Sequence, residues 1–209
     1  MGLSPELQLL QEREATYSAD PTIIGEKLAN KTLIMVGGPT KVGKTTLIRR
    51  AIDILPNAAA APSVTDRQRK EGDPSDYLTA TEGVTRHGLT SAIEKRTLVN
   101  YAIHPAGNIY ATDLDSYPAD FNFLPTIMNE TVIEQLRHAG FKKAAIAYIL
   151  MSENAYLQTV GNDSFNGKRA ARMEEAISSL EYAKEHVEDI SFIHNRLGQD
   201  RLEFAAKDL

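Results

Sequence analysis

A glycine-rich stretch near residue 40 carries the clearest chemical signal in the sequence. Residues 38–45 read Gly-Pro-Thr-Lys-Val-Gly-Lys-Thr and match the phosphate-binding pattern G-x-x-x-x-G-K-[ST] in full. In such a loop the backbone N–H groups surround phosphate oxygens, the lysine reaches the β- and γ-phosphates, and the threonine hydroxyl binds Mg²⁺. We therefore expect a nucleoside triphosphate site with Mg²⁺ on Thr45. Its residues would be Gly38, Pro39, Thr40, Lys41, Val42, Gly43, Lys44, Thr45 and Thr46.

A second group of charged residues follows shortly after this loop. The segment 63–77 places three cations, Arg67, Arg69 and Lys70, within four positions and ends on Tyr77. Guanidinium groups bind phosphate oxygens bidentately, and a tyrosine hydroxyl can add a further hydrogen bond. The segment could therefore hold a second, phosphorylated substrate, or it could be a solvated charge run on a loop. Composition alone does not separate these two interpretations.

The phosphate loop can work only if a strand leads into it and a helix follows it. Apolar residues predict a strand over Thr32–Val36 and, at helical spacing, a helix over Thr45–Leu55. Alternation over 98–112 predicts a β-hairpin around Pro105-Ala106-Gly107. Later elements are predicted as strands over 121–128, 144–150 and 190–193, and as helices over about 131–138 and 168–188. Helices between strands predict an α/β fold, namely the three-layer P-loop NTPase fold around a mainly parallel central sheet.

The remaining segments give weaker signals. Ser4-Pro5 and Asp20-Pro21 are typical helix starts, so residues 1–30 are predicted to form a helical N-terminal extension. The stretch 58–88 is polar and reads as irregular. We find neither metal-ligand spacing among the five histidines nor the sequence signal of a serine hydrolase.

Composition limits the class of protein. The chain has 209 residues, of which 42% are apolar and 24% charged, as expected of a globular α/β protein. Its net charge of −5 argues against nucleic acid as the main partner, and the absence of cysteine excludes disulfides and thiolate metal sites. No apolar run reaches membrane-spanning length and the first residues do not read as a signal peptide, so we predict a cytoplasmic protein without membrane contact. The oligomeric state stays open.

The segment 63–77 also resembles a known family. Its Ser-Val-Thr-x-Arg start, followed by a basic residue, glycine, an acid and Asp-Tyr, resembles the nucleoside-monophosphate-binding segment of guanylate kinases. Residues 107–112, Gly-Asn-Ile-Tyr-Ala-Thr, resemble that family's Gly-Asn-Tyr-Tyr-Gly-Thr hairpin, and Arg172 and Asn195 lie in similar pairs near the end. The resemblance implies a guanylate-kinase-like domain over 31–209, with a small β-containing monophosphate-binding subdomain at about 58–115 and a lid at about 152–170.

The same resemblance implies roles for individual residues. The acceptor phosphate would be bound by Arg67, Lys70, Tyr77 and Tyr110. Ser63 and Thr112 would face a guanine base. Lys44 and Arg172 would be the catalytic cations on the transferring phosphoryl group, and Asn195 would lie near the adenosine of ATP. The implied reaction is ATP + GMP to ADP + GDP, with Mg²⁺ as cofactor and ATP and a nucleoside monophosphate as partners.

Two departures from the family pattern leave alternatives open. Asn100 stands where the family's base-reading glutamate would fall, and the lid segment 156–167 contains no arginine. Asparagine can donate as well as accept, which favours a changed base preference. Fewer lid cations favour slower chemistry. The alternatives are a P-loop kinase for another phosphorylated small molecule and a non-catalytic guanylate-kinase-like binding module. A GTPase switch is disfavoured because it gives the basic segment no purpose.

Overall fold

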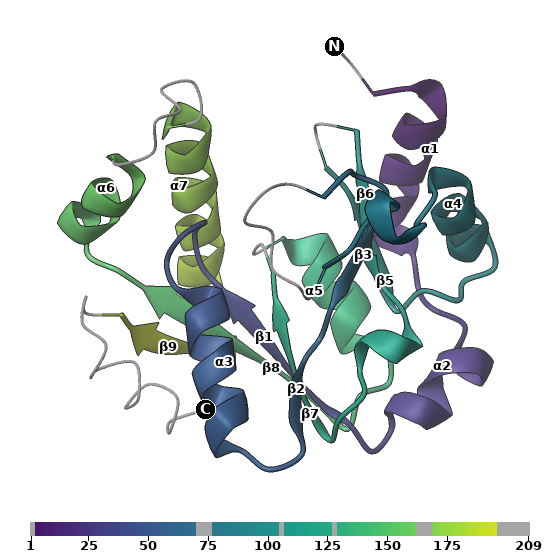
Figure 1. The fold of residues 1–209 in the computed structure, drawn as a ribbon, viewed down its shortest axis with the longest axis horizontal. Coiled ribbons are helices and arrows are strands. Elements are labelled where there is room, and N and C mark those ends of the chain that lie inside the picture. The colour runs from purple at the N-terminus through teal and green to yellow at the C-terminus, as the bar shows by residue number, and fades with distance from the viewer. Residues whose placement is uncertain (1–2, 70–76, 105–106, 127–128, 162–168, 196–209) are drawn as a thin grey trace. The chain divides into compact units, whose positions relative to one another are not determined.

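A computed structural model describes residues 3–69, 77–104, 107–126, 129–161 and 169–195 (Figure 1). The chain divides into two compact units, which are described separately. Unit 1 comprises Met1–Thr32, Ala61–Asn122 and Glu130–Ala144, and unit 2 comprises Leu33–Ala60, Phe123–Asn129 and Ala145–Leu209.

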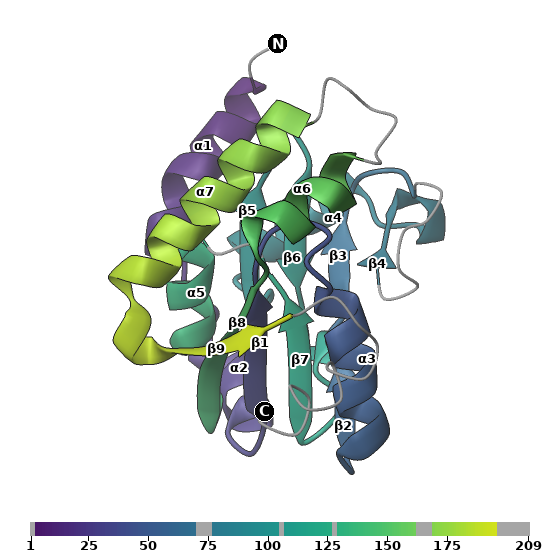
Figure 2. The ribbon, with the colours of Figure 1, turned by 90° about the vertical axis from the view of Figure 1, so that its left-hand side faces the viewer.

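Unit 2 is built on a five-stranded sheet in the order β2-β7-β1-β8-β9, which can be followed in Figure 2. The strands are β1 (Thr32–Gly37), β2 (Ala58–Ala60), β7 (Phe121–Pro125), β8 (Lys143–Leu150) and β9 (Ile190–His194). The helices are α3 (Lys44–Ile54), α6 (Glu153–Gly161), α7 (Arg169–Glu185) and the short η4 (Val187–Asp189). The sheet is mostly parallel, and β8 and β9 pair in parallel from Ile146↔Ile190 to Leu150↔His194.

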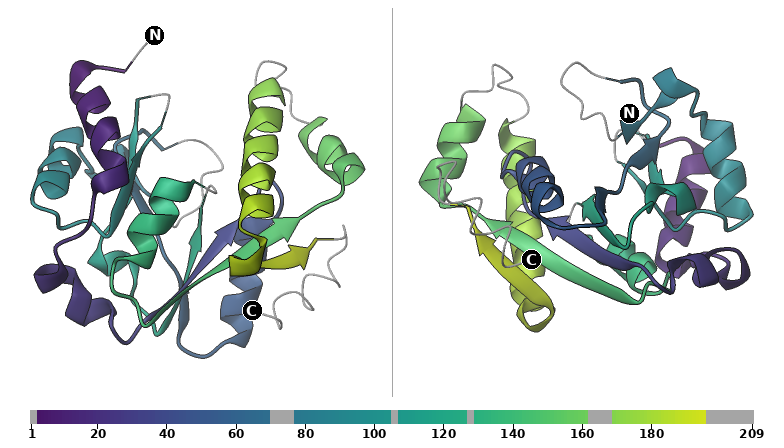
Figure 3. Two further views of the ribbon diagram at one scale, coloured as in Figure 1. Left: turned by 180° about the vertical axis from the view of Figure 1, so that it is seen from behind. Right: turned by 60° about the horizontal axis from the view of Figure 1, so that its bottom comes forward.

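Helices cover both faces of this sheet. Ala147 and Ile149 of β8 belong to the buried core that Leu47 and Ile48 of α3 complete. Tyr148 lies between them and points to the opposite face, where its hydroxyl lies 3.1 Å from Ser179 Oγ of α7. Helices α3 and α7 therefore lie on opposite sides of the sheet (Figures 1 and 3). The predicted three-layer α/β fold is confirmed.

Unit 1 contains a four-stranded sheet in the order β4-β3-β6-β5. Its strands are β3 (Ser63–Thr65), β4 (Tyr77–Leu78), β5 (Asn100–Ile103) and β6 (Ile109–Thr112). Around it lie α1 (Pro5–Arg13), η1 (Glu14–Thr16), α2 (Pro21–Leu28), η2 (Ala80–Glu82), α4 (Arg86–Glu94), η3 (Leu114–Ser116) and α5 (Glu130–Arg137). β5 and β6 form an antiparallel hairpin, in register from Asn100↔Thr112 to Ile103↔Ile109.

One face of this second sheet is buried against helices. The core cluster joins strand residues to α1 and α4 through Val64, Tyr101, Ile103, Ile109 and Ala111 from the strands and Leu7, Leu10, Leu89 and Ile93 from the helices. The Ser4 and Asp20 side chains cap α1 and α2, as their positions before proline predict. The N-terminal helices thus belong to the core of unit 1.

Most predicted elements are confirmed to within a few residues, and the main exceptions are the stretch read as irregular and α6, which lies in the segment assigned to the lid. Residues 58–88 contain β2, β3, β4 and η2, and α4 begins at Arg86. The helix predicted to reach residue 188 ends at Glu185, before the 3₁₀ turn η4. Within the described ranges, no helix is long and apolar enough to cross a membrane.

Candidate functional site

The glycine-rich loop in unit 2 connects β1 to α3, as its motif requires. Gly38 and Gly43 have φ values of 134° and 104°, and Lys41 also adopts a positive φ of 68°. A side chain at Gly38 would place its Cβ 2.9 Å from Val42 Cγ1 and 3.0 Å from the Ile149 carbonyl oxygen. Only glycine fits there, because both the backbone conformation and the space exclude a Cβ.

The lysine of the motif folds back onto its own loop. Lys44 Nζ donates to the carbonyl oxygens of Gly38 at 2.6 Å and Pro39 at 2.9 Å. Gly43 is the N-cap of α3, so the first backbone N–H groups of the helix open toward the loop. A cation beside a helix N-terminus attracts an anion, and phosphate oxygens are suitable partners for both.

Asn195 is brought to this loop from the far end of the sequence. Its backbone N–H donates to Leu150 O at 2.8 Å, which extends the β8–β9 pairing by one residue. Its Nδ2 donates to Val42 O at 2.8 Å. A Cβ at Gly43 would lie 2.9 Å from the same Nδ2 and would displace the Asn195 amide. The second motif glycine therefore permits the positive φ of its own backbone and leaves room for the Asn195 side chain.

The register of the sheet in unit 1 places the strand residues that were predicted to bind the acceptor substrate on one face. Val64 pairs with Ala111 and Thr65 with Tyr110, while Asn100 pairs with Thr112. Side chains alternate between faces along a strand, so the polar residues point away from the apolar core. We call this surface the polar face. It carries Ser63, Thr65, Asn100, Tyr110 and Thr112.

Three side chains form a buried hydrogen-bonded chain at one end of the polar face. Thr112 Oγ1 donates to Asn100 Oδ1, and the Tyr117 hydroxyl lies 2.7 Å from Thr112 Oγ1. Asn100, Thr112 and Tyr117 are 6%, 2% and 0% exposed. Burial raises the pKa of the Tyr117 hydroxyl above its ordinary range, so this group stays protonated.

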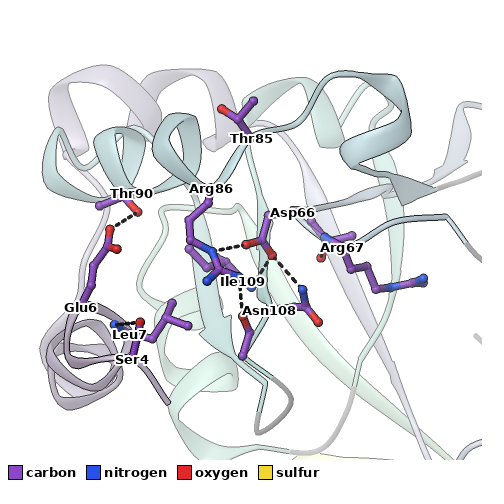
Figure 4. A network of polar contacts seen from close by, with 12 residues as sticks. Ser4, Glu6, Leu7, Asp66, Arg67, Thr85, Arg86, Thr90, Asn108 and Ile109 are labelled. Carbon is purple, nitrogen blue, oxygen red and sulfur yellow. Dashed lines mark hydrogen bonds and ion pairs between the residues drawn. The ribbon is translucent and has the colours of Figure 1, made fainter. Parts of the chain in front are cut away.

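Arg67 and Tyr110, both predicted to bind the acceptor phosphate, lie together. The Arg67 guanidinium carbon lies 6.0 Å from the centroid of the Tyr110 ring. Arg67 also donates from Nη1 to Gln68 O at 3.2 Å. Figure 4 shows its side chain extending away from the neighbouring Asp66.

Asp66 and Arg86 form a network that the sequence did not indicate. Arg86 Nε donates to Asp66 Oδ2 at 2.6 Å and its Nη2 donates to Gly107 O at 2.5 Å (Figure 4). Asp66 Oδ1 accepts from the Ile109 N–H at 2.8 Å and from Asn108 Nδ2 at 3.4 Å. The carboxylate next to Arg67 thus anchors the 107–109 end of the hairpin. Twenty residues separate the two partners, and no sequence pattern connects them.

Arg69, another of the three cations of segment 63–77, forms an ion pair with Glu82. Its Nε donates to Glu82 Oε1 at 2.8 Å. Hydrogen bonds from Arg69 and then from Thr79 lower the pKa of the Glu82 carboxyl to about 2. Arg69 therefore holds η2 rather than adding to a free cationic patch.

For several predicted site residues the structure describes only the backbone or does not describe the residue. Lys70 and residues 162–168 of the predicted lid lie outside the described residues. Tyr77 lies in β4 and Arg172 in α7, and of both only the backbone is described. Thr40, Thr45 and Thr46 lie in or directly after the loop, with Thr46 exposed and the other two half-buried.

Comparison with known proteins gives one local and one overall similarity. A curated guanylate kinase from Rubrobacter xylanophilus is 34% identical over 82 residues, which is 38% of this chain and 40% of that protein. The match thus spans well under half of that relative. The crystal structure of guanylate kinase from Anaplasma phagocytophilum shares the fold with a TM-score of 0.55 and 15% identity, covering 86% of this chain and 82% of that one. No protein-family model matches the chain. The chain is thus similar to a guanylate kinase over part of its length, and it shares the overall fold of a guanylate kinase structure.

Proposed function

We propose that this protein transfers the γ-phosphoryl group of ATP to a nucleoside monophosphate, with GMP as the favoured acceptor. The observation that carries the proposal is the preformed phosphate loop, in which Lys44 Nζ donates hydrogen bonds to the carbonyl oxygens of Gly38 and Pro39. A pure binding module has no need for this lysine. The relatives that the chain resembles are guanylate kinases, which motivates the choice of acceptor.

The donor half of the reaction would use the loop and its neighbours. On binding ATP, Lys44 Nζ would exchange two backbone carbonyls for β- and γ-phosphate oxygens, which are stronger, charged acceptors. Asn195 would hold the loop through Val42 O, 2.8 Å away, and lie beside the nucleoside. Arg172 would stabilise the charge of the transferring phosphoryl group, a role inferred from the resemblance.

Magnesium fits the donor half. Thr45, half-buried in the first turn of α3, supplies one hydroxyl oxygen. Mg²⁺ commonly takes only one or two protein ligands when it also binds substrate phosphates, so a single hydroxyl beside the loop is a sufficient protein contribution. When bound, the ion would neutralise charge on the β- and γ-phosphate oxygens.

The acceptor half would use the polar face. Arg67, beside Tyr110, would bind the acceptor phosphate bidentately, and Tyr110 would donate its hydroxyl to the same group. Lys70 and Tyr77 would complete this phosphate site. Phosphoryl transfer needs positioning and positive charge more than covalent chemistry from the protein, so these residues supply what the reaction requires.

The test is release of ADP from Mg·ATP with candidate acceptors. Wild-type protein should form ADP with GMP and dGMP, and Lys44→Ala should lower the rate about 100-fold or more because it removes a cation from the transition state. Lys184→Ala is the matched control, since this lysine is exposed in the last turn of α7. ADP formed only with a sugar phosphate would select a kinase for another acceptor, and binding without any turnover would select a binding module.

A further inference from the structure

Lys41 of the phosphate loop has a backbone conformation that lysine rarely adopts. The Val42 N–H donates to Pro39 O at 3.2 Å and closes the turn 39–42, in which Lys41 is the third residue and has a φ of 68°. A turn with a positive φ at its third position normally has glycine or asparagine there, because a longer side chain crowds its own backbone. The loop therefore carries backbone strain at a lysine, where glycine would carry none.

The loop turns its apolar residue inward and this lysine outward. Val42 is 1% exposed and packs in the core of unit 2, whereas the neighbouring Lys41 is exposed. Residues 27–52 contain six lysines and arginines and no acidic residue, and the N-terminus of α3 adds a partial positive charge. Like charges repel one another, so a polyanion such as a triphosphate chain stabilises this arrangement.

The proposed transfer needs positive charge at the γ-phosphoryl group. An oxygen of the acceptor phosphate forms a bond to the γ-phosphorus, while the bond from that phosphorus to the β–γ bridging oxygen breaks and its electron pair stays on ADP. Preorganised cations beside these oxygens lower the barrier. Segment 156–167, in the predicted lid, contains neither lysine nor arginine. A lysine in the phosphate loop can supply the charge that this segment lacks.

We propose that Lys41 is a catalytic residue that contacts the γ-phosphate of ATP and takes the place of a lid arginine. The proposal rests on the proposed function, since it assigns a cation to the γ-phosphoryl group of that reaction. The ammonium group of Lys41 binds a γ-phosphate oxygen and keeps its proton throughout the transfer. The backbone strain is the cost of placing this cation in the loop, as is common for strained residues at functional sites.

Calorimetry with Mg·ATP and Mg·ADP measures this contact apart from turnover. ADP lacks the γ-phosphate, so Lys41→Met should weaken the binding of ATP about tenfold and that of ADP less than about threefold, since a hydrogen bond to a charged group is worth about a factor of ten or more. Lys41→Arg keeps the charge and should keep the wild-type ratio of the two affinities. Equal losses for ATP and ADP in Lys41→Met, or no loss for either, would overturn the proposal.

Turnover and thermal stability separate the charge of Lys41 from its backbone. Lys41→Met removes the charge and keeps the strain, whereas Lys41→Gly removes both. Both variants should lower the rate of ADP formation with GMP about 100-fold. Lys41→Gly should melt no lower than wild type and up to about 4 °C higher, so unfolding does not explain its lost rate. Lys184→Met, at an exposed lysine in the last turn of α7, is the matched control and should change neither affinity nor rate.

The outcomes distinguish this proposal from the proposed function. Wild-type turnover of GMP with an undiminished rate in Lys41→Met or Lys41→Gly would overturn the proposal and leave the proposed function standing. Absence of wild-type turnover with any acceptor would reject the proposed function. The ratio of ATP to ADP affinities in Lys41→Met would then still decide whether Lys41 contacts the γ-phosphate.

Discussion

At the scale of single residues, Asp66 holds together the part of unit 1 that is proposed to bind the acceptor, although the sequence shows it only as one acid in a polar segment. Its side chain is 3% exposed and paired with Arg86, and it accepts the backbone N–H of Ile109 at 2.8 Å. A buried carboxylate with several donors is costly to disturb, because the donors lose their charged partner. The residue therefore fixes the hairpin next to Arg67.

Asp66→Asn tests this anchoring. The amide keeps the shape but loses the charge opposite Arg86, so we expect a loss of about 1–3 kcal/mol in the free energy of unfolding, discounted because Arg86 is 40% exposed. Urea unfolding followed by circular dichroism measures it. Glu134→Gln removes the more exposed pair with Arg137 and should cost under about 1 kcal/mol. Equal costs for both variants would contradict an anchoring role.

The two halves of the candidate site differ in how far sequence could predict them. The phosphate loop is readable because its parts, from Gly38 to Thr45, are neighbours along the chain and act through backbone geometry. The pairing of Asn100 with Thr112 depends on strand register, and the pairing of Asp66 with Arg86 depends on how α4 packs against the sheet. Register is a tertiary result, and no local pattern specifies which polar side chains meet.

At the scale of elements, side chains from η1 and α5 bind the backbone groups at an open strand edge. β5 is an outer strand of its sheet, and the N–H groups of Tyr101 and Ile103 donate to Gln135 Oε1 at 2.8 Å and Glu14 Oε1 at 2.5 Å. The Tyr101 hydroxyl also donates to Leu10 O at 2.8 Å. Side chains from η1 and α5 thus accept hydrogen bonds from edge N–H groups that could otherwise pair with another strand.

Glu14 makes this edge sensitive to pH. Burial raises the pKa of its carboxyl above the ordinary value of 4.5, and the hydrogen bond from Ile103 opposes part of that shift. A raised folded-state pKa means that the contribution to stability is full below pH 4.5 and is lost as the pH rises through the folded-state pKa. At pH 8 the folded protein therefore bears the cost of a buried charge.

Glu14→Gln removes that charge and keeps an oxygen for the Ile103 N–H. The variant should exceed wild type in free energy of unfolding at pH 8, and the difference should shrink as the pH falls toward 4.5. Urea titrations at several pH values measure it. Glu12→Gln, exposed in α1, is the control and should show no such trend. A difference that grows at low pH would contradict the assignment.

Elements with strong periodicity were predictable, and those stabilised by tertiary contacts were not. β8 is a continuous apolar run and was located to within one residue. Helix α4 was missed because it buries only Leu89 and Ile93 and contains Gly88 in its first turn. Its start depends on the Thr85 side chain, which accepts from the Gly88 N–H, and on the Arg86 pair with Asp66.

At the scale of the whole molecule, the proposed chemistry is divided between two units with separate sheets and cores. The phosphate loop and Asn195 belong to unit 2, and the polar face belongs to unit 1. A ligand that binds only the folded form stabilises it by about 2.7 kcal/mol at 100 times its Kd. Each substrate should therefore protect the amides of its own unit.

Hydrogen exchange followed by mass spectrometry can test this division. Mg²⁺ with a non-hydrolysable ATP analogue should slow exchange most in 36–50, at the phosphate loop and α3, and GMP should slow it most in 99–112, at the β5–β6 hairpin. The ligand raises the free energy of opening for the segments it contacts, so protection there should reach about 100-fold at saturation. Lys44→Ala should lose the protection by the ATP analogue and keep that by GMP. Protection of the phosphate loop by GMP alone would mean that the monophosphate binds at the donor site, and a two-substrate kinase would then be the wrong description of this protein.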